Sequence, residues 1–204
     1  MPLPDLAYFL ATGVENPLDI RYQDVGGFLP GVITFTMAPQ RVWDCPIITI
    51  EMRFNSFQYR LVDCQVRNIV EVPGAGGIIW QVTALDRRWK WQEWTISGMY
   101  NKYLENGALW KKTEKKPKDL LGLLFKKLNE KNYDLSKVDD KPRYEVNWCN
   151  AKVIIEADNL CQRMGCRLVH NLNDTYSVMP IGVGDPIPVQ NGIKSYTRGV
   201  TLPV

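Results

Sequence analysis

Between residues 32 and 86 the chain alternates apolar and polar positions with a period of two, which is typical of half-buried β-strands. The runs VITFTM, PIITIEMRF, FQYRLVDCQVR and IIWQVTALD follow this pattern over residues 32–37, 46–54, 57–67 and 78–86. Asn55-Ser56 and the PGAGG stretch at 73–77 separate the runs as turns, and PGAGG lacks the spacing of a phosphate-binding loop. The pattern therefore predicts a β-rich, barrel-like N-terminal half.

After residue 110 the apolar positions recur with the period of an amphipathic helix. One helix is expected to begin near Pro117, and a second to be capped by Asn150 and to end before Gly165. A strand at 166–170, a polar turn at 171–174 and a returning strand at 175–182 follow, and a last strand is expected at 195–204. The fold class is thus α+β. The two helical stripes consist of Leu120, Leu121, Leu124, Phe125 and Leu128, and of Ala151, Ile154, Ala157, Cys161 and Met164.

Three segments follow from these patterns. Residues 1–31 are rich in Pro and Gly and are predicted to form an N-terminal arm with a short helical turn near Leu6–Leu10. Residues 32–110 form the β-rich, barrel-like domain, and residues 111–204 form a smaller α+β domain with two helices and a β-hairpin. The boundary is placed at the change into the Lys-rich stretch near 108–116.

The segment LDRRWKWQEWTISGMYNKYLENG, residues 85–107, combines aromatic and basic side chains and admits two interpretations. Alternation of Trp89 and Trp91 with Arg88 and Lys90 favours a short strand, followed by a second strand that begins near Trp94. In this interpretation the rings are buried in the β-domain or at a subunit interface. The candidate core or interface residues are Trp89, Trp91, Trp94, Tyr100 and Tyr103.

The alternative is a nucleic-acid-binding module on the basic segment 85–118. This segment holds nine basic and four acidic residues, whereas the whole chain has a net charge of only +3. Aromatic rings beside basic groups can stack on bases and contact phosphates, and Arg87, Arg88 and Lys90 are the candidates for such contacts. A net charge this small does not by itself indicate a nucleic-acid partner.

The rest of the 204-residue chain shows no motif of catalysis or of cofactor binding. A metal site at Cys161, Cys166 and His170 would lack a fourth ligand, so the five cysteines are expected to be free thiols. No apolar run is long enough to span a bilayer, and the start MPLPDLAYFLATG lacks the basic region of a signal peptide. We therefore expect a protein made in a reducing cytoplasm, with no enzymatic activity, no cofactor, no metal and no membrane partner.

Two stretches carry a resemblance to a known family. The first begins WQVTALDRRWKWQEWTISGMYN and continues through LENG to KKTEKKPKDLLGLLFKKL; the second is NWCNAKVIIEADNLCQRMGCRLVHNLNDTYSVMPIG. The first resembles minor tail proteins of tailed bacteriophages. The second resembles the tail-hub, or baseplate hub, proteins and the late control protein D group. In these a helix ends at a Gly and is followed by a strand, a polar turn and a second strand. The matching positions here are 151–164, Gly165, 166–170, 171–174 and 175–179, so the resemblance covers roughly residues 78–182.

The resemblance implies a structural protein of the virion tail. Hubs of this group assemble as a trimeric ring that joins the tail tube to the central spike or tail tip, so the implied partners are further copies of the chain and other tail or baseplate proteins. Nucleic acid would be met only by passage through the ring's lumen. Such hubs are commonly longer than 204 residues, and no catalytic residues are carried over from them.

Overall fold

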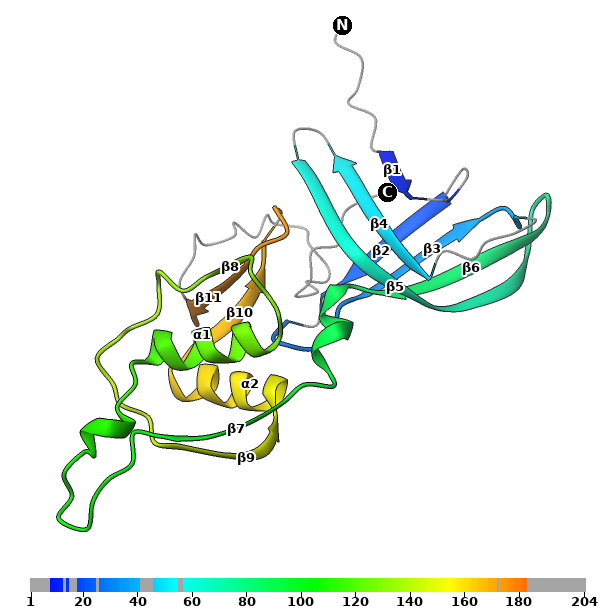
Figure 1. Cartoon of the computed structure of the whole chain (residues 1–204). Helices are drawn as coiled ribbons and strands as arrows, with labels where there is room; N and C mark the ends of the chain where they lie inside the picture. The colour runs from blue at the N-terminus through cyan, green and yellow to red at the C-terminus, as the bar shows by residue number, and fades with distance from the viewer. Residues whose placement is uncertain are drawn as a thin grey trace, which may run out of the picture.

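The computed structural model describes residues 8–12, 14, 18–24, 26–40, 46–54, 57–171 and 173–182. The expected turn at Asn55-Ser56 and the expected last strand at 195–204 lie outside these residues. Within the described part no helix is long and apolar enough to cross a membrane. The chain forms a strand-rich α+β fold in which a curled, half-barrel sheet lies on one side and an α+β part lies on the other (Figure 1).

The curled sheet is antiparallel and has six strands in the order β1-β4-β5-β6-β3-β2. Consecutive hairpins pair β4 with β5 and β5 with β6, which accounts for the regular apolar alternation seen in the sequence. Register shifts between Ile48 and Ile50 and between Val66 and Asn68 mark bulges, which bend a sheet and increase its twist. The strands are β1 (Tyr8–Ala11), β2 (Leu18–Gln23), β3 (Val32–Met37), β4 (Ile47–Phe54), β5 (Phe57–Gly74) and β6 (Gly77–Leu85).

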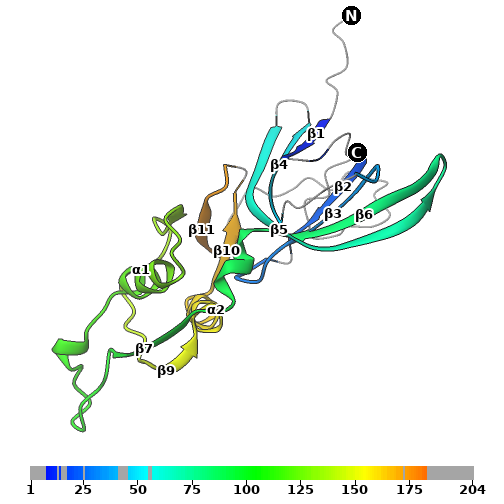
Figure 2. The same ribbon diagram turned by 45° about the vertical axis from the view of Figure 1, so that its right-hand side comes forward.

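The hairpin of β5 and β6 projects beyond the rest of the sheet (Figures 1 and 2). Strand β4 pairs with β5 only as far as Gln65, so the end of β5 pairs with β6 alone among the described strands. A turn at 75–76 closes this hairpin between Gly74 and Gly77. The exposed large apolar residues of the hairpin are Ile69, Val70 and Ile78.

The α+β part consists of two helices with small sheets around them. Strand β7 pairs antiparallel with β9, while β10 and β11 form a hairpin to which β8 adds in parallel. Helix α1 begins at Pro117, a favoured first residue because proline needs no hydrogen-bond acceptor there. The elements are η1 (Arg87–Trp91), β7 (Thr95–Tyr100), η2 (Lys111–Thr113), α1 (Pro117–Lys127), β8 (Tyr133–Asp134), β9 (Val146–Lys152), α2 (Val153–Arg163), β10 (Cys166–His170) and β11 (Tyr176–Pro180).

Two hydrophobic clusters correspond to these two parts. The cluster of the sheet is built from the alternating residues of β3, β4, β5 and β6, for example Ile33, Phe35 and Met37. The second cluster lies between α1, α2 and the strands β9, β10 and β11, and it includes Phe28 and Trp91. Along the chain the cluster of the sheet ends with Ala84, and the second cluster, apart from Phe28, begins with Trp91 of η1.

Two features of the sequence prediction differ from the structure. The segment 1–31 contributes β1, which pairs with β4, and β2, which pairs with β3; residues 8–10 are strand and form no helical turn. Asn150 does not cap α2: it lies within β9 at a positive φ of 47°, and Lys152 occupies the cap position. Asparagine adopts a positive φ more readily than most residues, so its presence at this position suits a bent strand as well as a helix cap.

Candidate functional site: a buried polar junction

The Trp-rich segment forms a 3-10 helix, η1, and the strand predicted across Trp89 and Trp91 is therefore wrong. Asp86 causes the difference, because its side chain accepts a hydrogen bond from the backbone N–H of Arg88 at 3.0 Å and so caps the turn. In this conformation Arg88 and Trp91, three positions apart, both point inward. Trp91 is only 2% exposed and packs on Phe28, Phe125 and Tyr176.

The other aromatic candidates lie in different surroundings. Trp89 is half-buried and donates from Nε1 to the backbone oxygen of Asp63 at 2.9 Å. Tyr100 is half-buried and packs edge-on against Trp148 in the second cluster. Trp94 and Tyr103 are 43% and 45% exposed. The structure thus places the five rings at several sites and does not gather them on one face.

The basic candidates do not form an open surface. Arg87 and Arg88 are buried, at 8% and 1% exposure, and both are engaged in ion pairs. Lys90 is exposed and pairs with Asp63 at 2.7 Å. Two of the three groups that would contact phosphates are therefore unavailable, and the geometry gives no support to the nucleic-acid alternative.

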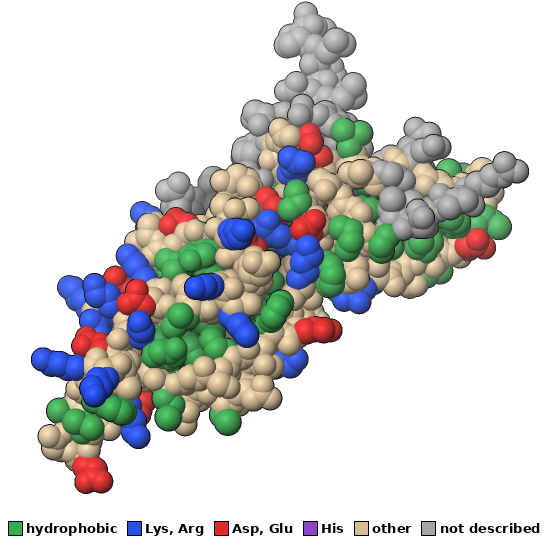
Figure 3. All heavy atoms as spheres, viewed as in Figure 1, with side chains coloured by type: hydrophobic (Ala, Val, Ile, Leu, Met, Phe, Trp, Pro, Cys, Tyr) green, Lys and Arg blue, Asp and Glu red, His purple; other side chains and the backbone are tan. Residues whose placement is uncertain are grey.

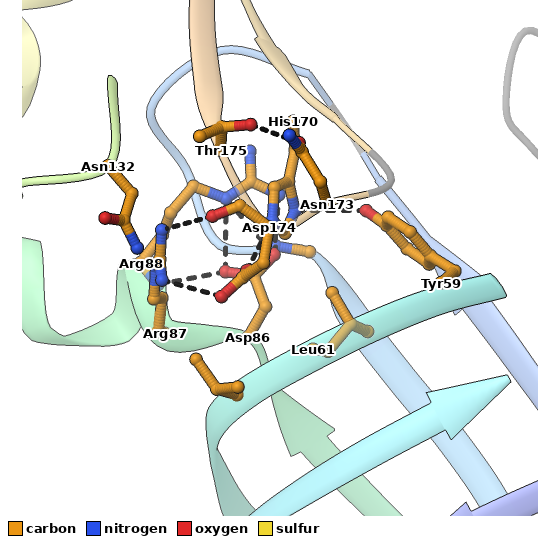
Figure 4. A network of polar contacts seen from close by, with 12 residues as sticks. Tyr59, Leu61, Asp86, Arg87, Arg88, Asn132, His170, Asn173, Asp174 and Thr175 are labelled. Carbon is orange, nitrogen blue, oxygen red and sulfur yellow. Dashed lines mark hydrogen bonds and ion pairs between the residues drawn. The ribbon is translucent and has the colours of Figure 1, made fainter.

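Arg87 and Arg88 belong to a network of buried polar groups between the sheet and the α+β part, which we call the polar junction (Figure 4). Its groups come from β2, β5, η1, the loop after α1 and the β10–β11 hairpin, so five distant segments meet there. The polar junction consists of Tyr22, Tyr59, Asp86, Arg87, Arg88, Glu130, His170 and Asp174.

Asp86 is the centre of one half of the polar junction. Its carboxylate accepts hydrogen bonds from the Gly31 backbone N–H at 2.8 Å, from the Tyr22 hydroxyl at 3.0 Å and from Arg88 NH2 at 2.6 Å. Gly31 is required at this point, since an added Cβ would lie 2.6 Å from the Tyr22 ring and 2.8 Å from the Asp86 carboxylate. One carboxylate thereby fixes the end of β6 to the start of β3.

Arg88 extends this half toward the loop before β3. Its NH2 group pairs with Asp24 at 2.8 Å, and its NH1 group donates to the backbone oxygen of Gly27 at 2.8 Å. These bonds hold the loop that carries Phe28 into the second hydrophobic cluster. A guanidinium suits this position because it offers donors in several fixed directions.

Arg87 is the centre of the other half. NH1 pairs with the Asp174 carboxylate at 2.7 Å, NH2 donates to the Asp174 backbone oxygen at 2.8 Å, and Nε lies 3.1 Å from Glu130. Glu130 in turn accepts from the backbone N–H groups of Lys131 and Asn132. Arg87 therefore joins η1 to the loop after α1 and to the turn between β10 and β11.

His170 connects the sheet to Asp174. Its Nε2 lies 2.9 Å from the Asp174 carboxylate, and its Nδ1 lies 3.1 Å from the Tyr59 hydroxyl and 3.2 Å from the Tyr22 hydroxyl. A carboxylate only accepts, so Nε2 carries the proton in this arrangement. The Tyr22 hydroxyl donates to Asp86, which leaves the Tyr59 hydroxyl as the donor to Nδ1. The single lone pair of Nδ1 is then used by Tyr59, and the Tyr22 oxygen is a polar neighbour of Nδ1 without being a second donor to it.

Burial and charge act together on the ionisable groups of the polar junction. Burial raises the pKa of Tyr22 and Tyr59 above the ordinary tyrosine value, and the charge of Asp86 contributes in the same direction. Burial alone would lower the pKa of Arg88, but the hydrogen bond to Asp86 and its negative charge outweigh that effect and raise the pKa. The tyrosines therefore stay neutral and the arginines stay charged at physiological pH.

The arrangement binds the two parts of the molecule to each other and leaves its polar groups little capacity for a substrate. The His170 side chain has no exposed area, and Asp86 and Arg88 are each 1% exposed at the side chain. Cys161 and Cys166 lie in the second hydrophobic cluster and do not form a site with His170. Within the described residues no group of His, Cys, Asp and Glu could hold a metal ion.

In the sequence, Asp86 is one of the four acidic residues of segment 85–118, and Asp174 lies at the end of the polar turn predicted at 171–174. Tyr22, Tyr59 and His170 likewise gave no sequence signal of a shared site, because they lie 37 to 148 positions apart along the chain. The available signal was the run Asp-Arg-Arg directly after an apolar strand, since three adjacent charges there need partners if the strand is buried.

Comparisons with known proteins come from solved structures. No family model matches the chain, and no curated protein matches it. The 43 kDa tail protein of prophage MuSo2 from Shewanella oneidensis is similar with a TM-score of 0.57 and 10% identity, over 85% of this chain and 53% of that one. A tail protein from Neisseria meningitidis is similar with a TM-score of 0.53 and 9% identity, over 84% and 50% of the two chains.

A third structure extends the likeness to a secretion system. The Escherichia coli protein c3393 is described as a component of the type VI secretion system with structural similarity to the phage T4 tail proteins gp27 and gp5. It is similar with a TM-score of 0.53 and 9% identity, over 84% of this chain and 48% of that one. The chain thus has a fold found in phage tail proteins and spans about half the length of the solved structures it matches.

Proposed function

We propose that the chain is a structural protein of a bacteriophage tail, a hub or baseplate component that forms a ring, most simply a trimer, between the tail tube and the central spike or tip. The observation that carries the proposal is the likeness of fold to tail proteins over 84–85% of the chain. The role requires no catalysis and no cofactor. It places the mature protein in the virion tail after synthesis in the host cytoplasm.

The surface of the sheet supports an assembling role. The two edge strands of the sheet expose Leu10 at 55% and Leu18 at 54% of their areas, and the β5–β6 hairpin exposes Ile78 at 58%. Open sheet edges with apolar side chains are places where other chains pair or pack, unless they are blunted by charge or covered. A tail ring and its neighbours would cover such edges.

The polar junction supports the same role through rigidity. It joins the sheet to the α+β part with buried, hydrogen-bonded ion pairs centred on Asp86 and Arg87. A component that carries load between a tube and a spike needs its two parts held in one orientation. Buried networks of this kind specify geometry because each member is directional and costly to leave unpaired.

The first test is quantitative mass spectrometry of purified phage particles from the source of this sequence. A few copies per particle, co-purifying with tail proteins, are expected for a ring at the end of the tube. Hundreds of copies would instead make the chain a head or tube component and remove the hub assignment. Its absence from purified particles would contradict the structural role itself.

A further inference from the structure

The residues between β7 and α1 form a small projecting hairpin at the far end of the α+β part from the sheet (Figure 1). We call residues 102–112 the tip loop. The Trp110 N–H donates to the Lys102 oxygen at 2.8 Å, the Leu104 N–H donates to the Ala108 oxygen at 2.9 Å, and Tyr103 bridges to Leu109. These bonds hold the two sides of the tip loop together around one isolated β-bridge.

The base of the tip loop is fixed to the body by Asn101. This side chain is fully buried and donates from Nδ2 to the backbone oxygens of Lys115 at 3.0 Å and Tyr144 at 2.9 Å, while its Oδ1 accepts from the Lys115 N–H at 2.7 Å. The Asn101 N–H also donates to the Thr113 oxygen at 2.8 Å. The body therefore presents the tip loop in one orientation, which reduces the entropy lost on binding.

The tip loop exposes large apolar side chains. Leu104 is 46% exposed and Trp110 is 39% exposed, and the ladder register places both on one face of the hairpin. Lys102, Lys111 and Lys112 are exposed around them and form no ion pair within the described part of the chain. Figure 3 shows this end of the molecule as a group of apolar side chains with basic ones beside it and an acidic side chain at the extreme tip. Exposed Trp within a charged surround is typical of an interface anchor.

A complementary surface lies elsewhere on the same chain. A pocket of about 260 Å³ opens between residues 26–29 and the first two turns of α2, and we call it the α2 pocket. Leu29 and Ile155 at its rim are 57% and 54% exposed. Asp158 in its wall contributes a negative charge, and an added Cβ at Gly27 would lie 3.3 Å from this carboxylate. The α2 pocket is thus apolar, open and acidic on one side.

We infer that the tip loop of one copy inserts its Trp110 and Leu104 side chains into the α2 pocket of the next copy, with the tip-loop lysines facing Asp158. The apolar side chains and the charges of the two surfaces are complementary. The tip loop cannot reach its own chain's α2 pocket, since Asn101 holds it at the opposite end of the α+β part (Figure 1). Contact between two different surfaces of identical chains propagates head to tail, and it closes into a ring when the rotation between successive copies divides a full turn.

This inference rests on the ring of the proposed function and names the surfaces that form it. A heterologous contact has a direct signature in disulfide trapping. In a Cys45→Ser, Cys149→Ser background, one variant carries Ala108→Cys, an exposed position beside Leu104 that leaves both anchor side chains in place, and a second carries Asn159→Cys. Oxidation of the mixture is expected to give a cross-linked dimer, and each variant alone is expected to give at least tenfold less. A chain with both substitutions is expected to give a ladder that stops at the ring size.

Matched controls separate the contact from random collision. Ile78→Cys, on the exposed β5–β6 hairpin, replaces Ala108→Cys in the control mixture with Asn159→Cys and is expected to give no dimer above background. No cross-link in the mixture of Ala108→Cys and Asn159→Cys, with both proteins folded by circular dichroism, would overturn the inference. Equal cross-linking by one variant alone would also overturn it, since that outcome indicates a two-fold contact.

Charge reversal gives an independent readout by light scattering. Asp158→Lys is expected to raise the protein concentration needed for assembly at least tenfold. Adding Lys111→Asp and Lys112→Asp to the same chain is expected to restore assembly at the original concentration. Failure of restoration would contradict the pairing of these charges. The mass spectrometry of particles tests the proposed function separately. If the chain is present in tails but the cross-link does not form, the proposed function stands and this contact is wrong. If the cross-linked ring forms but the chain is absent from particles, the contact stands and the proposed function is wrong.

Discussion

At the scale of single residues, the two carboxylates Asp86 and Asp63 show how burial sets the value of an ion pair. Asp86 and its partner Arg88 are each 1% exposed at the side chain, whereas Asp63 and its partner Lys90 are 50% and 44% exposed. Water and salt screen the exposed pair, while the buried pair has no alternative partners once broken. An ion pair of the same type therefore contributes very different amounts to the free energy of unfolding at the two sites.

Replacing Asp86 by Asn is expected to lower the free energy of unfolding by about 3–5 kcal/mol, because the substitution leaves the Arg88 charge buried without its main partner. Urea titration followed by circular dichroism measures the loss. Asp63→Asn is the matched control, with an expected cost below about 1 kcal/mol. Equal costs for the two variants would show that the Asp86 pair is solvated in solution.

Gly31 is expected to tolerate no side chain. In Gly31→Ala the new methyl group would press on the Tyr22 ring at 2.6 Å and on the Asp86 carboxylate at 2.8 Å, so we expect a loss of about 1–3 kcal/mol from overpacking. Thermal unfolding provides the measurement. Gly76→Ala meets no atom within 4 Å and serves as the control, with little change expected.

At the scale of elements, η1 illustrates a local pattern that tertiary contacts override. Alternation of Trp and basic residues favours a strand, but Asp86 caps a helical turn and both arginines find buried partners. The turn rotates Trp91 into the second hydrophobic cluster and leaves Trp94 at the surface. Helix α1 and strand β10 show the opposite case, since the period of their apolar residues agrees with the burial that the structure gives them.

Truncation of Trp91 and of Trp94 is expected to lower the free energy of unfolding by very different amounts. Trp91→Ala should cost about 3–5 kcal/mol, since the ring is 2% exposed and its removal leaves a cavity among aromatic neighbours. Trp94→Ala should cost far less, because 43% of that residue is already exposed. Chemical unfolding of both variants checks the difference, and a near-zero cost at Trp91 would contradict the packing of η1.

At the scale of the whole molecule, the polar junction couples folding to pH. Tyr59 of the junction and the neighbouring Tyr176 are buried, and Tyr22 is half-buried; desolvation is the largest cause that raises the pKa of each phenol. The unfolded chain releases these protons from about pH 10 upward, while the folded chain retains them. Stability is therefore independent of these groups below pH 10 and falls above it.

Tyr59→Phe is expected to reduce this pH dependence. Each retained proton contributes a slope of about 1.4 kcal/mol per pH unit between the unfolded and folded pKa values, so removing one phenol should lower the slope by that amount. Urea titrations at a series of pH values from 9 to about 11.5 measure it. An unchanged slope would show that Tyr59 ionises in the folded protein and is not shielded.

The sequence by itself determined the elements whose apolar period matches their burial. It predicted the strand at 32–37, the helix that begins at Pro117 and the hairpin of 166–170 with 175–182, and the structure confirms these as β3, α1, β10 and β11. Period carries this information because neighbours along the chain alternate between core and solvent in a regular element.

Only the tertiary structure decided how these elements are joined. The polar junction is made of pairs such as Arg87 with Asp174 and Tyr59 with His170, which lie 87 and 111 positions apart. It also decided that the first residues pair as β1 and β2 and that η1 is helical. A charged or hydroxyl side chain looks the same in sequence whether water or a distant partner satisfies it, and burial alone distinguishes the two.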